Sequence, residues 1–487
     1  MGLLQTLSDK LKNRSLTSRV LVQSYYDRIA ASDDTIKAFI SLQKEVALAY
    51  AEAVDAALDK GESLPTLAGI PIAVKDNINI RNTHTTCASR MLENYVSPYN
   101  ATVIDKLYQH RMIPIGKTNL DEFAMGLSSE NSAFFTTRNP WNTDYSPGGS
   151  SSGSAAAVAA HFAPAALGSD TGGSIRQPAS FCSVTGIKPT YGRVSRFGLV
   201  AFASSLDQIG PLTQSVADGA LVLNAICGHD PMDSTSSPQP VPDFTKFLGK
   251  DIKGLRIGVP SELVSDAVHP DVRQSVFLAL DRLKTEGATY DLISIDALNY
   301  ALSVYFILSR AEASANLARF DGVRYGYRAP GTKSLREMIC KSRGMGFGSE
   351  VKRRIILGTY VLSAGYYEAY YLKALKARTY IQNAFQEAFQ TYDLLVTPTT
   401  PTLPFKLGVS SHNSVDSYLA DMAACPVNIA GLPAMSIPVG FSDGLPVGLQ
   451  LIGKPFDEGT LLGVGDRFQA LTDFHTQVAP TVCGVMP

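Results

Sequence analysis

GIPIAVK (69–75), ATVIDKLYQHR (101–111) and MIPIGKT (112–118) are the stretches that decide the fold class. The first and third are short apolar runs containing Gly and Pro, which is typical of buried strands, whereas the middle stretch has helical spacing. A strand, a helix and a strand in succession form the unit from which α/β proteins are built. We therefore predict an α/β fold.

The pattern continues on both sides of this unit. Residues 17–60 have helical spacing that stops at Gly61. The stretch SSGSAAAVAAHFAP (151–164) starts with serines and continues with strong helix formers, which predicts a helix. APAALGSD (163–170) then predicts a buried strand that ends in a polar loop. Loops at strand ends are where α/β proteins carry their chemistry. Further strands are predicted at 254–260, 393–401 and 445–453, with helices between them that include 271–286 and 350–384.

The chain length leaves the domain count open. Its 487 residues exceed the roughly 250–300 at which one core usually stops growing, so either two domains or one large sheet is expected. The Pro/Ser-rich stretch 228–244 is the best candidate for a surface connection between two halves. The strands predicted after it could rejoin the same sheet.

Composition excludes several classes of function. A net charge of -1 and a pI of about 6.7 argue against a chain that holds a nucleic-acid backbone by itself, although a local basic patch is compatible with them. The six cysteines are scattered without a CxxC pair, so neither a disulfide framework nor a zinc site is expected. The N-terminus lacks the apolar stretch of a signal peptide, and no apolar run approaches the length of a membrane span. We expect a soluble, cytoplasmic protein.

Two Gly/Ser-rich loops, at 146–154 and 168–176, are the candidate sites of chemistry. A glycine pair before a serine lets backbone N–H groups converge, which suits an oxyanion hole as well as a phosphate cradle. A phosphate loop would need a lysine after its last glycine, and neither loop has one. A lipase-type G-x-S-x-G occurs at 149–153, but no histidine of the chain lies in a patterned motif.

A serine nucleophile activated by a neutral lysine remains. Lys75 ends the apolar run GIPIAV and is followed by Asp76 and Asn77. Burial would lower the pKa of its amine, because a low-dielectric setting disfavours the charged form. A lysine at a strand end is more often simply solvated, so this feature alone does not establish a catalytic role.

GIPIAVKDN, PGGSSSGS and GSDTGGSIRQPA, in this order, resemble the three motifs of the amidase signature family. The resemblance implies a single domain over 1–487, with a helical N-terminal segment 1–65 and a large mixed β-sheet covered by helices on both faces. It assigns Ser174 as the nucleophile, Ser150 as the bridging serine and Lys75 as the final proton acceptor. The family also carries a cis peptide bond at the position of Gly149-Ser150.

The same resemblance places the oxyanion hole in the backbone of four consecutive residues. These are Thr171, Gly172, Gly173 and Ser174. Ser152 departs from the glycine that is commoner in the family, which concerns the packing of the loop and leaves the three catalytic positions intact.

Within the family, five segments are similar to the glutaminase subunits of tRNA-dependent amidotransferases: 122–126, 128–132, 192–215, 316–328 and 350–371. Leu127 departs from the small polar residue that is commoner there. The resemblance implies that glutamine is hydrolysed to glutamate and ammonia, and that the ammonia passes to a partner subunit that converts Glu-tRNA(Gln) to Gln-tRNA(Gln). The implied assembly is a heterotrimer with subunits B and C, in which the partner binds tRNA, ATP and Mg²⁺ and this chain needs no cofactor.

A pocket for free glutamine should pair both charges of the zwitterion, because an unpaired buried charge is costly. The resemblance assigns Arg354 to the α-carboxylate and Asp421 to the α-amino group, with Tyr305 lining the pocket. The choice of Arg354 over Arg353 rests on helical register alone. Both charged residues could equally be solvated helix-surface groups.

Three other hypotheses remain open at this stage. A stand-alone amidase of the same family would act on another small amide and would not need Arg354 and Asp421. A thiol amidase would use Cys182, although a buried cysteine that packs as a small hydrophobe is the commoner case. A scaffold subunit with a vestigial catalytic loop would bind partners without hydrolysing amides.

Overall fold

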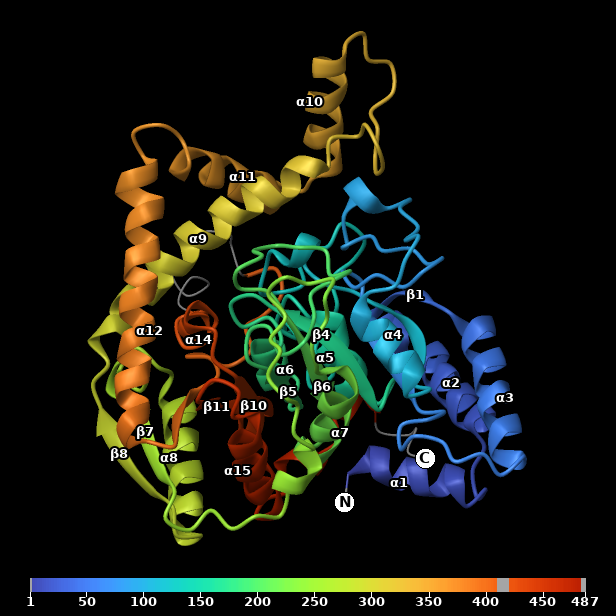
Figure 1. Ribbon diagram of the computed structural model, residues 1–487, viewed down its shortest axis with the longest axis vertical. Coiled ribbons are helices and arrows are strands. Elements are labelled where there is room, and N and C mark those ends of the chain that lie inside the picture. Colours follow the sequence, from blue (N-terminus) through green and yellow to red (C-terminus); the bar gives the residue numbers. More distant parts are fainter. Residues whose placement is uncertain (1, 410–419, 483–487) are drawn as a thin grey trace.

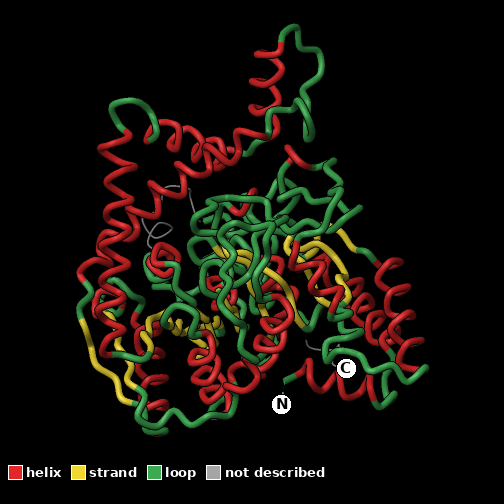
Figure 2. Tube along the Cα trace, viewed as in Figure 1, coloured by secondary structure: helices red, strands yellow, loops and turns green. Residues whose placement is uncertain are grey.

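A computed structural model describes residues 2–409 and 420–482 of the chain, and Cys483 lies outside them. The described residues form an 11-stranded sheet with the order β1-β3-β2-β4-β6-β5-β10-β11-β9-β7-β8. Helices surround the strands on both sides (Figures 1 and 2). The predicted α/β class and the large mixed sheet are confirmed.

The strands are β1 (Phe39–Leu42), β2 (Pro71–Lys75), β3 (Ile113–Thr118), β4 (Ala165–Asp170), β5 (Thr185–Lys188), β6 (Gln208–Thr213), β7 (Arg256–Pro260), β8 (Thr289–Ile293), β9 (Leu394–Pro398), β10 (Ala434–Ser442) and β11 (Leu445–Gly453). The α-helices are α1 (Leu3–Lys12), α2 (Ser18–Ile36), α3 (Lys44–Asp59), α4 (Thr102–Gln109), α5 (Ser152–Ala159), α6 (Arg176–Phe181), α7 (Val216–Ile226), α8 (Pro270–Thr285), α9 (Ala301–Asn316), α10 (Leu335–Gly346), α11 (Ser349–Val361), α12 (Lys373–Thr391), α14 (Cys425–Ala430) and α15 (Glu458–Ala470).

Strand pairing joins the two halves of the chain. β2 runs parallel to both β3 and β4, and β7 runs parallel to β8 and β9. The remaining pairs are antiparallel, among them β5 with β10. The strands that follow the Pro/Ser-rich stretch therefore belong to the same sheet as those that precede it.

Alternation along the strands places apolar side chains on both faces of the sheet. In β2, Ile72 and Val74 pack in the largest core cluster with α1, α4, α7, α8 and α15, whereas Ala73 packs on the other face in a cluster with α2, α3, α5 and α6. A third cluster extends that second face under α9, α11, α12 and α14. A strand buried on both faces reads as a continuous apolar run, which is the pattern of GIPIAVK.

Two predicted elements differ from the structure. The helix predicted over 350–384 is interrupted: α11 ends at Val361, Gly365 has a φ of 84°, and a π-helical turn at Tyr367–Leu372 precedes α12. A residue in the left-handed region cannot continue a right-handed helix, and glycine adopts it without strain. The helical segment 17–60 contains β1, whose four residues are too few to reveal an alternating pattern.

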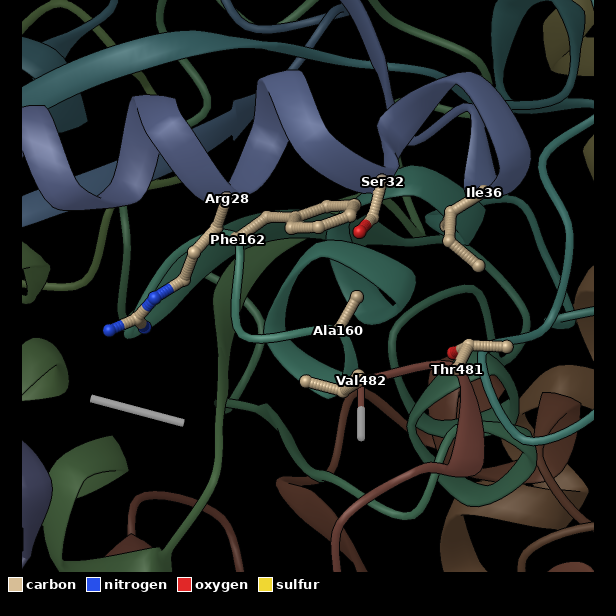
Figure 3. A pocket seen from close by; sticks show the side chains of 7 residues that line it. All are labelled: Arg28, Ser32, Ile36, Ala160, Phe162, Thr481 and Val482. Atoms are coloured by element: carbon tan, nitrogen blue, oxygen red, sulfur yellow. The ribbon is translucent and has the colours of Figure 1, made fainter. Parts of the chain in front are cut away.

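The C-terminal segment packs against α2. Arg28, Ser32 and Ile36 of α2 face the residues that follow α5 and the pair Thr481 and Val482 across a small pocket (Figure 3). Its volume of about 10 Å³ holds a single water at most. None of the described helices is long and apolar enough to cross a membrane.

Candidate active site

Lys75 is the last residue of β2, and its side chain is completely buried. Its Nζ lies 2.8 Å from Ser150 Oγ, 2.9 Å from Ser151 Oγ and 3.0 Å from Ser169 Oγ. The carbonyl of Ser169 is 3.3 Å away. The amine is therefore held at the carboxyl end of the strand by three hydroxyl groups, two of which sequence reasoning did not identify.

Burial lowers the pKa of Lys75 to about 7, against the opposing charges of Asp121, Asp170 and Asp207. This is the shift that the apolar setting of GIPIAVK predicts. A pKa in this range lets the amine lose its proton near neutral pH, and the uncharged amine is the form that can accept a proton from a serine.

The hydrogen bonds around the amine have a definite direction. The Ser151 hydroxyl donates to the carbonyl of Ser169 at 3.1 Å, and Ser169 Oγ accepts from the amide of Asn77 at 2.9 Å. Ser151 Oγ and Ser169 Oγ can thus each accept one N–H of a neutral Lys75 amine, which has two. In that arrangement the lone pair of the nitrogen can accept the hydroxyl proton of Ser150, whose Oγ lies 2.8 Å away.

Ser150 follows a cis peptide bond from Gly149, as the resemblance implied, and is completely buried. The Gly149 N–H donates to Gln177 Oε1 at 2.9 Å, and a Cβ at Gly149 would lie 2.2 Å from the carboxylate of Asp121. Glycine is required here because the Asp121 carboxylate fills the space of a side chain. Ser152, whose packing the sequence left open, is buried at the first position of α5.

Ser174 lies in the loop between β4 and α6. Its backbone carbonyl accepts a hydrogen bond from the Ser151 N–H at 3.0 Å, which joins the two Gly/Ser-rich loops, and 8% of the residue is exposed. Within the described part of the chain its hydroxyl makes no hydrogen bond. The contact between the hydroxyls of Ser174 and Ser150 therefore stays a prediction.

Asp170, the last residue of β4, shapes this loop. Its carboxylate accepts from the backbone N–H groups of Gly173 at 2.8 Å and Ile175 at 3.0 Å, and pairs with the buried guanidinium of Arg176 at 3.0 Å. Although burial opposes ionisation, Arg176 holds the pKa of Asp170 well below its usual range. A charge-assisted network of this kind fixes the backbone around the predicted nucleophile.

The predicted oxyanion positions differ in their hydrogen bonds. The Gly173 N–H is already used by Asp170. For the N–H groups of Gly172 and Ser174 no partner is found among residues 2–409 and 420–482. The hydroxyl of Thr171 donates to Asp207 at 2.6 Å, which holds the start of the loop against the 202–207 segment.

The predicted glutamine pocket adjoins this loop. A Cβ at Gly172 would lie 2.4 Å from the ring of Tyr305, and a Cβ at Gly173 would lie 3.9 Å from Asp421 Oδ1. Burial raises the pKa of Asp421 to about 6, and Arg354 and Arg310 act in the opposite direction. Tyr305 and Asp421 are therefore brought next to the predicted nucleophile loop.

Helical register separates the two arginines of α11. The side chain of Arg354 is 11% exposed and its Nε donates to Glu350 at 2.6 Å, whereas the side chain of Arg353 is 40% exposed. Arg310 is a second buried guanidinium of this region, and burial together with Arg354 lowers its pKa to about 9. Arg310 follows a buried stretch of α9, and no sequence motif marks it.

Cys182, the alternative nucleophile, is completely buried. Burial raises the pKa of its thiol far above the usual range, and its Sγ lies 3.4 Å from the carbonyl of Pro147. A protonated, enclosed thiol is a poor nucleophile. Among the described residues, no group of three or more His, Cys, Asp or Glu side chains could hold a metal ion.

Lys75 at the end of β2 and Ser150 before α5 lie within hydrogen-bond distance of each other, as the motifs of an amide hydrolase predict. A model of the amidase family matches residues 20–462. The chain belongs to this family, as the three motifs predicted.

Relatives of high identity share one name, that of the A subunits of glutamyl-tRNA(Gln) amidotransferases. The protein of that name from Desulforudis audaxviator is 56% identical over 478 residues, covering 98% of this chain and 97% of the relative. The one from Dehalococcoides mccartyi is also 56% identical, covering 96% of each. The crystal structure of the Thermotoga maritima protein of the same name is 43% identical, with a TM-score of 0.77, covering 92% of this chain and 90% of that one.

Proposed function

We propose that this chain is the glutaminase subunit of a glutamyl-tRNA(Gln) amidotransferase. It hydrolyses glutamine to glutamate and ammonia, and a partner subunit uses the ammonia with ATP and Mg²⁺ to convert Glu-tRNA(Gln) to Gln-tRNA(Gln). Subunits B and C complete a cytoplasmic heterotrimer, and tRNA is held mainly by the partner. The names of relatives at 53–56% identity over nearly the whole chain support this assignment.

The observation that carries the chemistry is the 2.8 Å hydrogen-bond distance between Lys75 Nζ and Ser150 Oγ, across which an uncharged amine can accept the proton of Ser150. In the proposed acylation, Ser174 Oγ attacks the side-chain amide carbon of glutamine as its proton moves to Ser150 Oγ and the Ser150 proton moves to Lys75 Nζ. Backbone N–H groups of the 171–174 loop stabilise the oxyanion. The intermediate collapses by breaking the C–N bond, and ammonia leaves with the proton returned through the same chain.

Deacylation uses the same relay with water as the nucleophile. Water attacks the acyl carbon, its proton passes through Ser150 to Lys75, and Ser174 recovers its hydrogen as glutamate leaves. No net proton is gained by the enzyme over the cycle. In both half-reactions Lys75 must first accept a proton and then return it. An amine with a pKa near 7 can do both at neutral pH.

The proposed pocket separates glutamine from other small amides. Arg354 would pair with the α-carboxylate and Asp421 with the α-amino group, while Tyr305 packs against Gly172 beneath the reacting amide. The inward position of Arg354 and the exposure of Arg353 support the register on which this assignment depends.

The test is Ser174→Ala in the assembled complex. Glutamine-dependent amidation and ammonia release should both be lost, whereas amidation supplied with ammonium chloride should continue at the wild-type rate, because ammonia generation alone is removed. Lys75→Ala should be about as damaging, since residues that act as one unit are not additive. Loss of the ammonium-supported reaction in the serine variant would mean that Ser174 is structural.

A further inference from the structure

The segment 319–346, which we call the basic arm, comprises the end of the connection after α9 and the helix α10. It extends away from the body of the molecule at the top of Figure 1. It contains seven Lys or Arg residues and two Asp or Glu residues, whereas the whole chain has a net charge of -1. The projecting segment therefore has a positive local charge, although the net charge of the whole chain is close to zero.

Most of these cations face solvent. Exposed residues of the arm are Arg319, Arg324, Arg328, Lys333, Arg336 and Lys341. Lys341 pairs with Glu337 at 2.7 Å, but no ion pair within the described residues engages Arg324, Arg328 or Arg336. Exposed guanidinium groups without a carboxylate partner remain available to an anionic ligand.

The arm is anchored firmly enough to present these charges. Arg343 donates to the backbone carbonyls of Leu317 at 2.8 Å and Phe320 at 2.9 Å, and the Tyr327 N–H donates to the carbonyl of Met91 at 2.7 Å. The loop part of the arm is therefore fixed to both its own base and the neighbouring 90–92 turn. Pre-ordered cations lose less entropy when they bind.

An aromatic pocket opens at the base of the arm. It has a volume of about 120 Å³, and Tyr95, Tyr99, Phe320 and Tyr325 are among the residues that line it, with Arg319. The ring centroids of Tyr95 and Tyr325 are 5.7 Å apart, and 38% of Tyr325 is exposed. Aromatic side chains beside arginines form the surfaces on which unpaired bases stack.

One residue that lines this pocket has a side-chain oxygen that is enclosed by protein and unpaired within the part of the chain that the structure describes. Asn79 lines it and is 2% exposed, and its backbone groups bond to Gly198 and Ala101, yet its Oδ1 accepts no hydrogen bond from the described residues. A buried acceptor without a donor costs free energy unless a ligand or water supplies one. The exocyclic amine of a nucleobase is a donor of the required kind, provided that the Asn79 side chain rotates toward the pocket when the base binds.

We propose that the basic arm and this pocket bind RNA, with the exposed arginines on phosphates and one unpaired base stacked among the tyrosines near Asn79. The proposal rests on the proposed function, in which tRNA is the RNA that the complex binds. It adds a contact between this chain and a tRNA that the partner subunit mainly holds. An acidic protein surface would use the arginines but neither the aromatic pocket nor the free acceptor of Asn79.

The experiment measures binding of an unacylated tRNA(Gln) transcript to the assembled heterotrimer over a series of salt concentrations. Arg324→Glu with Arg328→Glu should weaken binding at least tenfold and flatten the dependence of log affinity on log salt by roughly 0.7 for each phosphate that is no longer bound. Tyr325→Ala should weaken binding about tenfold with an unchanged salt slope, because stacking releases no counterions. Lys60→Glu with Lys253→Glu, at exposed positions outside the arm, is the matched control and should change neither quantity.

Unchanged affinity in both arm variants would overturn the proposal, as would an equal loss in the control. A heterotrimer that dissociates on gel filtration when the arginines are reversed would also overturn it, by showing that the arm contacts another protein of the complex. Ammonia release from glutamine without RNA, measured on the same preparations, should be unaffected by the arm variants. If the unmodified complex released no ammonia, the proposed function would fail and the RNA measurement would still decide the role of the arm.

Discussion

Titrating glutamine hydrolysis through neutral pH tests whether Lys75 works as an uncharged amine. Burial lowers its pKa to about 7 from the ordinary 10.5, so about 9% of molecules carry the neutral amine at pH 6 and about 91% at pH 8. A lysine with its ordinary pKa would be neutral in roughly 0.3% of molecules at pH 8. We expect kcat to rise about tenfold per pH unit below neutrality and to level off above pH 8.

Asp421 should add a second feature to the same titration. Burial raises its pKa to about 6, and its carboxylate is lost as the pH falls through that value. Because kcat/KM reports ionisations of the free enzyme, it should fall more steeply than kcat below pH 6. In the proposed complex Asp421 pairs with the α-amino group of glutamine and would stay ionised, so kcat should show the Lys75 step alone.

The assay is ammonia release between pH 5 and 9, with the fold checked at each pH by far-ultraviolet circular dichroism. Lys75→Arg, whose guanidinium stays charged throughout this range, should lose activity by at least 1,000-fold with no rising limb. A wild-type profile that still rises tenfold per pH unit at pH 9, or one that is flat down to pH 5, would refute the reasoning that burial supplies the base.

Two substitutions test the pocket, each with a matched control. Arg354→Ala should raise the KM for glutamine about 100-fold, because it leaves the α-carboxylate of glutamine unpaired. Arg353→Ala, on the exposed side of α11, should change the KM less than threefold. Equal effects in steady-state kinetics would mean that helical register does not distinguish the two arginines. Gly172→Ala should place a Cβ 2.4 Å from the ring of Tyr305, costing about 1–3 kcal/mol of stability and most of the glutaminase activity. The control is Gly344→Ala, where an added Cβ meets no atom within 4 Å. It should leave the ammonia release at the wild-type value and the thermal midpoint unchanged or slightly higher. A Gly172→Ala variant that is stable and active would contradict the close packing against Tyr305.

Sequence patterns predicted the elements whose signals are local. The continuous apolar runs predicted β2 and β4, and the glycine pairs predicted the two loops. Each of these predictions needs only residues that are neighbours in the sequence. The break in the helix predicted over 350–384 was missed, since an isolated glycine is also tolerated inside a helix and does not by itself mark an end. The order of strands in the sheet has no local signal at all.

In the candidate site, too, residues in local motifs were predicted from the sequence, whereas residues that act through distant contacts were not. Lys75, Ser150 and Ser174 lie in recognisable motifs, and the depressed pKa of Lys75 follows from the apolar run that precedes it. Ser169 lies within GSDTGGSIRQPA, but nothing in that motif marks it as a partner of Lys75. Arg310 lies in no motif, because its role comes from contacts with residues far away in the chain. Such partners become visible when the strands are assembled.

The network under the nucleophile loop has a consequence for biosynthesis. Asp170 is held by Asn428 at 2.9 Å, and Arg176 donates to Gln450 on β11. These two supports are encoded near the end of the chain, so a ribosome must have released β11 before the loop acquires its final shape. A polypeptide that ends before β11 lacks the support from Gln450, so we expect it to release no ammonia from glutamine until the chain has been completed.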